Sequence, residues 1–434
     1  MRCRNPLAAA CALLSALGLL AVPAPAATGP AAGDDLTFER VWTLVSEHSP
    51  RLAAAGFGLD ASAAESRQAG RGPNPELAVT VENFGGSGEA AGFGTAEATV
   101  AVAQVLELGG KRAHRAEEAR LAHELAGWDA LDARWQARAA ARAAFARAWA
   151  AQEAMSLADE VIATARDDSA AVHRRVLAGA ATPVDLARAR VAVASAGLDR
   201  RRRDAELAAA RAALAATWGD RTPRFGRVVG DLAEVAAPPS RTDLEDRLAD
   251  APRLQRGAAA AARQQAAVAA AVALGTPDLT ASAGYRRLGL QGDGDHAFVV
   301  GLSLPLPVRD TNRDGAAAAR ARLALLDAER RADQADAAAE LDAALAELGE
   351  AFDEIATLRE AILPAAAEAM GEARRAYDQG LFGLTDVAAV RMTFFDLRGR
   401  EIDALARYHA AAARLSALVG DAAALDTNDE GRRP

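Results

Sequence analysis

The chain has 434 residues and a formal net charge of −9 at pH 7, with 51% hydrophobic residues but only 4% aromatic ones. Its two cysteines, Cys3 and Cys11, both lie near the N-terminus, so the rest of the chain offers no thiol for a disulfide framework, a zinc–thiolate site or a catalytic nucleophile. The acidic balance argues against nucleic acid as a partner, because nucleic-acid binding depends on basic side chains that neutralise phosphates.

Residues 1–26 have the composition of a secretory signal peptide. Arg2 and Arg4 precede an apolar run at 7–22, and Ala-Pro-Ala follows at 24–26. A basic start, a short apolar run and small residues at a cleavage position are typical of exported proteins. A membrane anchor is the alternative, but the run is shorter than the ~20 residues that span a bilayer. Removal of this leader would take away two arginines and no acids, which changes the formal charge from −9 to −11.

Landmarks of the first half recur about 202 residues later, which predicts a tandem duplication. The matched landmarks are 48–52 with 250–254, 73–77 with 275–279, Gly179 with Gly380, and Asp185 with Asp386. We predict a first structural repeat at 27–220, a linker at 221–241, a second repeat at 242–421 and a disordered tail at 422–434. Each repeat is expected to contain a helix, a strand hairpin, a very long helix, a short turn and a long returning helix.

Four segments alternate between apolar and polar or small residues with the period of two that is typical of β-strands. These segments are 77–82 and 96–106 in the first repeat and 279–287 and 298–304 in the second. Strands of about ten residues are long enough to cross a hydrocarbon core when tilted. Ordinary hairpins on a soluble domain are the alternative. Since four strands cannot close a barrel, membrane strands would require several chains, and three chains would supply twelve strands.

The first strand pair ends in Gln-Val-Leu-Glu-Leu-Gly-Gly-Lys-Arg at 104–112. Gly109 and Gly110 supply the backbone freedom with which a strand becomes a helix. Lys111, the only lysine of the sequence, and Arg112 then begin the helical segment. We predict a strand-to-helix junction at these four residues.

The helical segments are very long. No proline occurs between Lys111 and Val176, and ~65 residues of straight helix would extend roughly 100 Å. In the second repeat, Pro364 is expected to kink or break the corresponding helix. The last segment has heptad-like apolar spacing at Leu405, Tyr408, Ala412, Leu415 and Val419. Such spacing favours coiled-coil packing, and a purely structural coiled coil is the alternative to any transport role.

Two short turns join the long helices, at 177–185 and 378–386. A glycine can end each outgoing helix in a left-handed cap, and Thr182 or Thr385 can cap the returning one, with Pro183 at its first position. Asp185 and Asp386 then lie in a first helical turn, where the helix dipole favours a carboxylate. Helix capping alone explains both turns without any function.

The sequence has no motif that indicates catalysis. It lacks G-x-S-x-G, Walker, Rossmann and H-E-x-x-H patterns, and its six histidines are scattered. Acidic residues mostly alternate with arginines along the helices, as on solvated faces. We therefore expect no enzyme, no bound cofactor and no metal site.

Several of these motifs resemble the TolC-like outer-membrane efflux proteins. They are P-N-P-E-L-x-V-x-V-E-N at 73–83, L-E-L-G-G-K-R at 106–112, I-L-P-x-A at 362–366 and the paired G-x5-D turns. The first two are most similar to the heavy-metal branch, which is typified by the cobalt-zinc-cadmium efflux component. The resemblance implies a mostly α chain with four strands. Three chains would form a 12-stranded barrel in the outer membrane, continued by a long α-helical barrel in the periplasm.

The same resemblance implies partners and roles. The channel would passively conduct substrate, as a homotrimer embedded in outer-membrane lipid, from a periplasmic adaptor and an inner-membrane RND-type pump. Asp386 falls where such channels place an aperture carboxylate, and Asp185 is its counterpart in the other turn; a second acid found three residues later in some members is Ala389 here. The expected adaptor contacts are Leu177, Gly179, Thr182, Pro183, Gly380, Leu381, Phe382 and Thr385. A periplasmic coiled-coil adaptor or scaffold of an export system is the alternative function.

Overall fold

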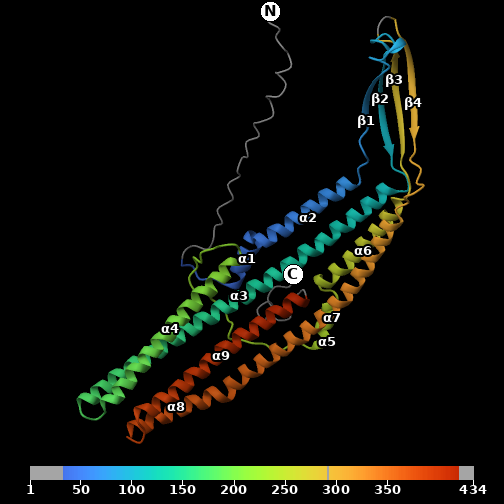
Figure 1. Ribbon diagram of the computed structural model, residues 1–434. Coiled ribbons are helices and arrows are strands. Elements are labelled where there is room, and N and C mark those ends of the chain that lie inside the picture. The colour runs from blue at the N-terminus through green and yellow to red at the C-terminus, as the bar shows by residue number, and fades with distance from the viewer. Residues whose placement is uncertain (1–32, 291–292, 420–434) are drawn as a thin grey trace, which may run out of the picture.

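The protein is an elongated molecule in which strands form one end and helical turns form the other (Figure 1). This computed structural model describes residues 33–290 and 293–419. The predicted signal peptide and the predicted C-terminal tail therefore lie outside the described residues.

The two halves of the chain contain similar elements in the same order. The first half contains α1 (Phe38–His48), α2 (Pro50–Ala69), β1 (Glu76–Glu82), the short 3-10 helix η1 (Gly88–Ala90), β2 (Glu97–Leu106), α3 (Lys111–Leu177) and α4 (Pro183–Ala216). The second half contains α5 (Arg241–Ala249), α6 (Pro252–Ala273), β3 (Leu279–Leu288), β4 (Asp295–Ser303), α7 (Arg313–Thr357), the π-helix η2 (Leu358–Ile362), α8 (Leu363–Asp378) and α9 (Leu384–Val419). The single helix expected at the start of each repeat is in fact two helices, because Pro50 and Pro252 each begin a new one.

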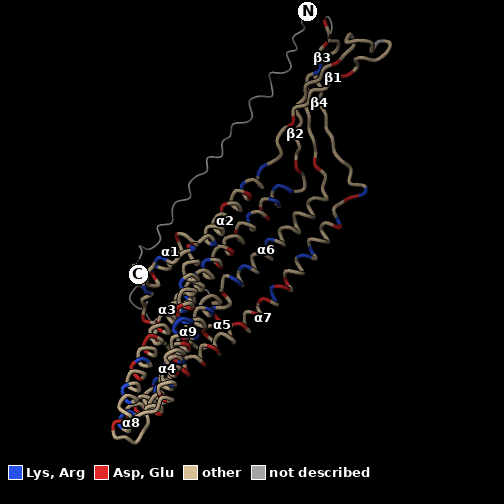
Figure 2. The backbone as a smooth tube through the Cα atoms, turned by 60° about the vertical axis from the view of Figure 1, so that its left-hand side comes forward, with Lys and Arg blue, Asp and Glu red and all other residues tan. Residues whose placement is uncertain are grey.

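The four strands form one antiparallel sheet in the order β1-β2-β3-β4. The two predicted hairpins are joined because β2 of the first half pairs with β3 of the second, with Val100 opposite Tyr285. Strands β1 and β4 are the edges of the sheet, and each pairs with one neighbour within the described chain. Figure 2 shows that charged residues are frequent along the helices and sparse along the middle of the strands.

The helices form two layers of four helices each, and α3 belongs to both. Next to the sheet, α2 packs on α3, α3 on α6 and α6 on α7; towards the turns, α4 packs on α3, α3 on α9 and α9 on α8. Helix α3 has 67 residues, as the absence of proline predicted, and a straight helix of that length extends roughly 100 Å. Within the described ranges, no helix has the apolar stretch that a membrane-crossing helix requires.

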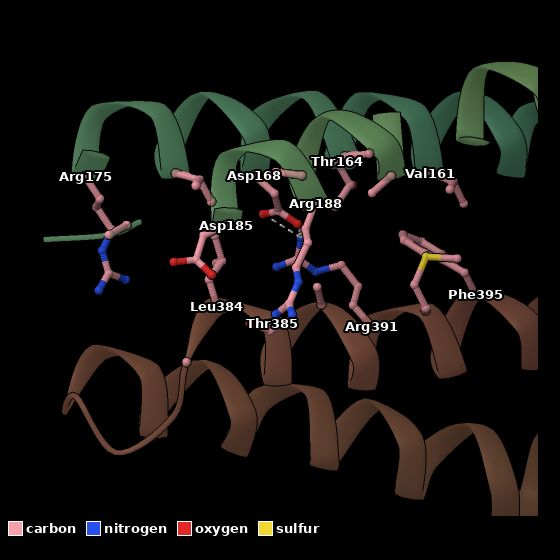
Figure 3. Close-up of a pocket in the computed structure, with 18 of the residues that line it drawn as sticks. Val161, Thr164, Asp168, Arg175, Asp185, Arg188, Leu384, Thr385, Arg391 and Phe395 are labelled. Atoms are coloured by element: carbon pink, nitrogen blue, oxygen red, sulfur yellow. Dashed lines mark hydrogen bonds and ion pairs between the residues drawn. The ribbon is translucent and has the colours of Figure 1, made fainter. Parts of the chain in front are cut away.

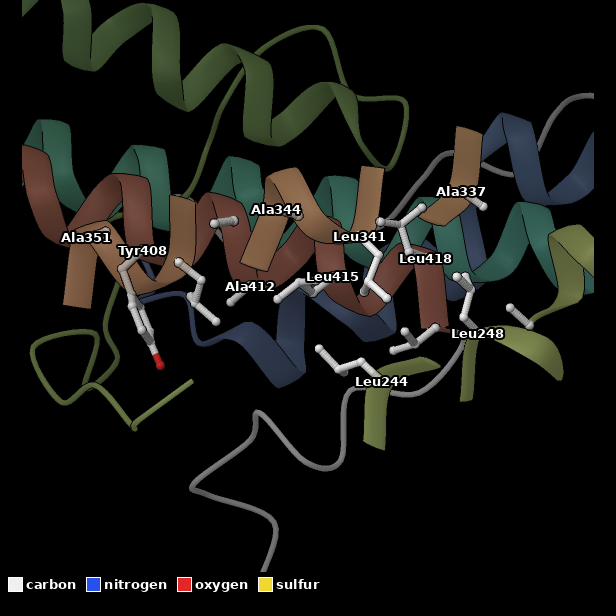
Figure 4. Close-up of a cluster of buried hydrophobic side chains, with 14 of the residues drawn as sticks. Leu244, Leu248, Ala337, Leu341, Ala344, Ala351, Tyr408, Ala412, Leu415 and Leu418 are labelled. Atoms are coloured by element: carbon white, nitrogen blue, oxygen red, sulfur yellow. The ribbon is translucent and has the colours of Figure 1, made fainter. Parts of the chain in front are cut away.

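Leucine and alanine side chains make up most of the core where α5, α7 and α9 meet (Figure 4). Leu341, Leu348 and Ile355 of α7 face Leu415 and other residues of α9, with many alanines between them. Small side chains let helices approach closely, so an alanine-rich chain can still form a dense interface. The five heptad positions predicted in the last helix are all buried in this core.

Candidate functional site

The two faces of the sheet differ in chemistry. We call one of them the apolar face; its strand residues are Leu77, Val79, Val81, Ala98, Val100, Val102, Gln104, Leu106, Leu279, Ala281, Ala283, Tyr285, Arg287, His296, Phe298, Val300 and Leu302. Most of its large side chains are exposed, and Phe298, Val300 and Leu302 of β4 are 88%, 80% and 73% accessible. An exposed apolar face of this size is what a lipid-facing sheet requires.

The opposite face, which we call the polar face, carries small and charged residues. Arg286 lies near the end of β3 that is farthest from the helices, and it donates to Glu97 at 3.0 Å and to the Thr99 hydroxyl at 2.9 Å. Its guanidinium also lies 3.5 Å from Glu82 of β1. These contacts tie three strands from both halves of the chain together on the side away from the apolar face.

The sheet joins the helices at the predicted strand-to-helix junction. Gly109 and Gly110 have φ values of +67° and +72°, and α3 begins at Lys111. A Cβ on Gly109 would lie 2.8 Å from the Thr276 side chain, so this position also requires a close approach between the two halves. The Lys111 amine lies 2.8 Å from Asp278, whose carboxylate also accepts from the backbone N–H of Leu108 at 3.0 Å.

At this junction, neighbouring basic side chains lower the pKa values of two carboxyl groups. The Lys111 amine holds the pKa of Asp278 below its ordinary value, with a smaller contribution from the Leu108 N–H. Nearby, hydrogen bonds from Arg115 lower the pKa of Glu107, and the Arg115 guanidinium also donates to the carbonyls of Ala69 and Arg71. The side chain of Arg112 is exposed. The only lysine of the sequence therefore joins the two halves where strands become helices.

The turn between α3 and α4 has the predicted helix caps. Gly179 has a φ of +72°, and Pro183 is the first residue of α4. Thr182 and Asp185 form a reciprocal capping box: the Thr182 hydroxyl accepts from the Asp185 N–H at 3.2 Å, and the Asp185 carboxylate accepts from the Thr182 N–H at 3.0 Å. The Thr182 hydroxyl also donates to the Asp185 carboxylate at 2.7 Å. This bond and the one from the Thr182 N–H lower the pKa of Asp185. Leu177, at the end of α3, is exposed.

The turn between α8 and α9 is capped differently. Gly380 has a φ of +76°, but α9 begins at Leu384, so Thr385 lies inside the first turn and the expectation that it caps the helix is wrong. The cap position belongs to Gly383, which has no side chain to accept a hydrogen bond. Its N–H donates instead to the Asp386 carboxylate at 2.9 Å. Leu381 and Phe382 are exposed at the end of this turn.

A cavity of about 360 Å3 lies between the two turns, walled by α3, α4 and α9 (Figure 3). Of the residues singled out in the sequence, Asp185 and Thr385 line it together, whereas Leu177, Gly179, Thr182, Pro183, Gly380, Leu381, Phe382 and Asp386 do not. The remainder of its lining is mostly apolar.

The charged residues that connect the two turns were not predicted from the sequence. Arg391 of α9 forms an ion pair of 2.9 Å with Asp168 of α3, and these side chains are only 16% and 24% exposed. Arg175 of α3 donates to the hydroxyl of Tyr377 in α8 at 2.9 Å and lies over its ring, 5.7 Å from the centroid. The sequence shows these arginines only as part of the acid–arginine alternation typical of solvated helices, so it gave no signal for either contact.

No three His, Cys, Asp or Glu side chains within 33–290 and 293–419 come together in a way that could hold a metal ion. The described chain combines a sheet that has an exposed apolar face, a set of long helices and two capped turns whose helices are joined by an ion pair.

Comparisons with known proteins give the family. The family described as outer membrane efflux protein matches residues 43–220 and 244–421. The cobalt-zinc-cadmium resistance protein CzcC of Cupriavidus metallidurans is 31% identical over 389 residues, which cover 90% of this chain and 91% of that protein. The nickel-cobalt-cadmium resistance protein NccC of Alcaligenes xylosoxydans xylosoxydans is 27% identical over 276 residues, which cover 64% of this chain and 62% of that protein.

Solved structures share the fold. The structure of CusC has a TM-score of 0.75 at 18% sequence identity and covers 90% of this chain and 94% of that one. The outer membrane protein VceC of Vibrio cholerae has a TM-score of 0.71 at 18% identity, covering 88% of this chain and 96% of that one. The chain therefore belongs to the outer membrane efflux protein family, as its motifs predicted.

Membership of this family fixes the general role of the protein. It is an outer-membrane efflux channel with a TolC-like fold, most of whose chain lies in the periplasm, and it is a passive conduit without enzymatic activity. The alternative of a periplasmic adaptor or scaffold is not favoured by these comparisons.

Proposed function

We propose that this channel is the outlet of a tripartite RND-type pump and that its cargo is heavy-metal cations. Proteins of the family work with a periplasmic adaptor and an inner-membrane pump. Support for the cargo comes from the relatives, which are named for resistance to cobalt, zinc, cadmium and nickel. Support from the chain is its acidic balance, since a water-filled acidic passage attracts cations over a Debye length of about 8 Å.

We infer further that the channel is a homotrimer, and the open edges of the chain carry this inference. Strand β1 and helices α2 and α4 form one edge, whereas β4, α7 and α8 form the other. Two different edges fit together head to tail, and such a heterologous contact closes into a ring when the rotation between copies allows it. Three copies would give a closed sheet of twelve strands without an unpaired edge in lipid. The repeats at 27–220 and 242–421, with the linker 221–241 between them, would then be quasi-equivalent parts of the ring.

An exposed apolar stripe on α4 supports this assembly. Val184, Val191 and Leu198 are spaced by seven residues and are 59%, 69% and 61% exposed in the single chain. A seven-residue spacing is suited to a second helix of comparable length. We propose that α8 of the next copy, whose exposed face includes Ala365 and Ala369, packs on this stripe.

The turns at the far end would form the periplasmic aperture. We propose that Asp386 and Asp185 of three copies converge there, so that their charges restrict ion passage until the adaptor separates the turns. The exposed residues Leu177, Leu381 and Phe382 are the apolar contacts that we propose for the adaptor. Gly179, Thr182, Pro183, Gly380 and Thr385 would shape the same surface.

Disulfide cross-linking tests the assembly. The chain's two cysteines lie in the predicted signal peptide, so an engineered pair would be the only one in the exported protein. We expect the double variant Val191→Cys, Ala369→Cys to form covalent trimers under oxidation. Either single variant should remain monomeric on a denaturing gel, because a heterologous contact does not bring identical residues together. Trimers formed by Val191→Cys alone would reject the proposed contact between α4 and α8. A folded double variant that forms no trimers would reject it as well.

Conductance tests the aperture. In planar bilayers, Asp386→Ala should raise the closed-state current, whereas Asp378→Ala, an acid at the end of α8, serves as the matched control. An unchanged current would remove Asp386 from the gate.

The cargo is tested in cells: loss of the gene should raise cellular zinc, cobalt or cadmium. Unchanged metal content together with retention of an organic compound would assign a different cargo.

A further inference from the structure

We propose that the outer end of the apolar face binds phosphate groups of lipids in the outer leaflet, through Arg287 and His296. The sheet is oriented by its connections, because the strand ends at Glu76, Leu106 and Leu279 lead to the helices. Arg287 and His296 lie at the opposite end of the sheet, where they are direct cross-strand partners. This is the end farthest from the periplasmic helices.

The placement of charge on the described strands singles out this pair. Among the strand residues of the apolar face, Arg287 and His296 are the only basic side chains, and the face carries no Asp or Glu. Both side chains are exposed. A basic group is costly against hydrocarbon, so its occurrence at one end of a lipid-facing surface indicates the level of the headgroups.

Acidic groups at the same level lie on the other side of the sheet. Glu82, Glu97 and Asp295 belong to the polar face by register, and Arg286 forms ion pairs with two of them. The sheet therefore separates basic side chains on the lipid side from mostly acidic side chains on the inner side. An anionic headgroup on the lipid side meets the basic side chains and does not meet the inward carboxylates.

Aromatic rings lie next to His296 on the apolar face. Tyr285 stacks on His296 with ring centroids 5.4 Å apart and meets Phe298 edge-on at 6.0 Å. The Tyr285 hydroxyl is hydrogen-bonded to Nδ1 of His296, which leaves Nε2 as the nitrogen available to a lipid. Rings at the boundary between hydrocarbon and headgroups fix the depth of a barrel in the membrane, and here they also orient the imidazole. The guanidinium of Arg287 has the planar fork that matches phosphate oxygens.

The test uses the purified full-length channel in detergent. Diphosphoryl lipid A, monophosphoryl lipid A, phosphatidylcholine and inorganic phosphate are each titrated, with retained lipid counted by native mass spectrometry. We expect wild-type protein to prefer the diphosphoryl lipid. The double variant Arg287→Gln, His296→Gln should bind it at least about fivefold more weakly, the effect of losing one basic group near an anionic surface. Arg201→Gln, an exposed arginine on α4 far from the sheet, is the matched control.

Three results would overturn the proposal: equal affinity of the double variant and wild type, equal binding of phosphatidylcholine and lipid A to wild type, or competition by inorganic phosphate alone at equal concentration. If the double variant does not fold, the comparison of the two lipid A species on wild type still decides. Restoration of binding by Arg287→Lys in the His296→Gln background would support a charge-based contact.

Discussion

The two long helix hairpins occupy equivalent places in the two halves, but they are built differently. In the first, α3 runs for 67 residues without interruption into a turn closed by the capping box of Thr182 and Asp185. In the second, the π-helix η2 separates α7 from α8 just before Pro364. The extra residue in a π-turn accommodates a proline that cannot donate to the preceding turn, so the predicted interruption is a change of helical winding.

The difference extends to what holds each hairpin in place. Helix α4 packs on α3, to which Arg200 joins it through an exposed pair with Asp159, whereas arginines tie α9 to helices of both hairpins. Arg391 and Arg398 of α9 pair with acids of α3, and Arg407 pairs with Glu354 of α7. Within η2, Arg359 donates to Glu401 of α9 at 2.6 Å and to the carbonyl of Ala233 at 2.8 Å. The outgoing helix of the first hairpin is thus continuous. The outgoing helix of the second is interrupted, and individual side-chain bonds, each of which a single substitution can remove, hold that hairpin in place.

The largest effect is expected from the ion pair between the hairpins. Asp168→Ala would leave the guanidinium of Arg391 unpaired in a site where it is only 16% exposed. Loss of one partner of a mostly buried pair should destabilise the α9 end of the hairpin by roughly 2 kcal/mol. Hydrogen exchange of the first turns of α9 measures this loss, and exchange in α4 should change less.

The pair of Arg200 and Asp159 is the matched control for this prediction. It joins α4 to α3 within the first hairpin, with side chains that are 40% and 51% exposed. Asp159→Ala should cost less than about 1 kcal/mol, because solvent screens an exposed pair. Equal protection loss in the two variants would mean that the connection between hairpins is no stronger than the surface pairs.

A smaller effect is expected from the threonines of the two turns. Thr182→Ala removes the cap of α4 and should cost about 1 kcal/mol, seen as faster exchange of the first amides of α4. Thr385→Ala should change the start of α9 by less than about 0.5 kcal/mol, because Gly383 holds the cap position there. A comparable loss in both variants would show that Thr385 stabilises its helix in some way other than capping.

The structural features that could be predicted from the sequence are those that a residue causes in its own backbone or in that of its close neighbours. Gly109, Gly110, Pro183 and Pro364 act on their own backbone or that of close neighbours, so their effects could be inferred from chain order and residue type. The alternation of Phe298, Val300 and Leu302 likewise predicted a strand with unlike faces. These features gave the elements, the junction and most of the caps.

The contacts that organise the site are long-range and were not predicted. Asp278 accepts from the Leu108 N–H across 170 residues, and Arg391 meets Asp168 across 223. No sequence spacing or motif predicts either pairing, because both depend on how two helix hairpins and two strand pairs lie side by side. The cap of α9 was misassigned for a smaller reason: Thr385 has the residue type of a cap, but the helix begins one residue before it.

The smallest expected effect concerns pH and comes from a histidine of α9, whereas α4, the equivalent helix of the first hairpin, contains none. His409 of α9 lies under the chain that links the two halves, and its Nε2 donates to the carbonyl of Leu232 at 2.8 Å. Burial lowers the pKa of His409 below its ordinary value of 6.5, and the nearby Arg142 guanidinium adds to this, while the bond to Leu232 opposes it. The folded protein therefore holds this imidazole neutral where the unfolded chain would protonate it.

The sign of the pH dependence follows from this shift. The stabilising contribution of His409 is fully present above the unfolded pKa of about 6.5, and it is lost as the pH falls through that value towards the lowered folded pKa, because only the unfolded chain takes up the proton. Wild-type protein should thus lose more unfolding free energy between pH 8 and pH 5.5 than His409→Gln, whose amide can still donate to Leu232. Guanidinium unfolding in detergent at the two pH values measures the difference between the two proteins, in which the contributions of the other five histidines cancel. Equal pH dependence in both proteins would mean that water reaches His409, and the linker would then hold α9 less tightly than the hydrogen bonds between Tyr408 and Ala236 imply.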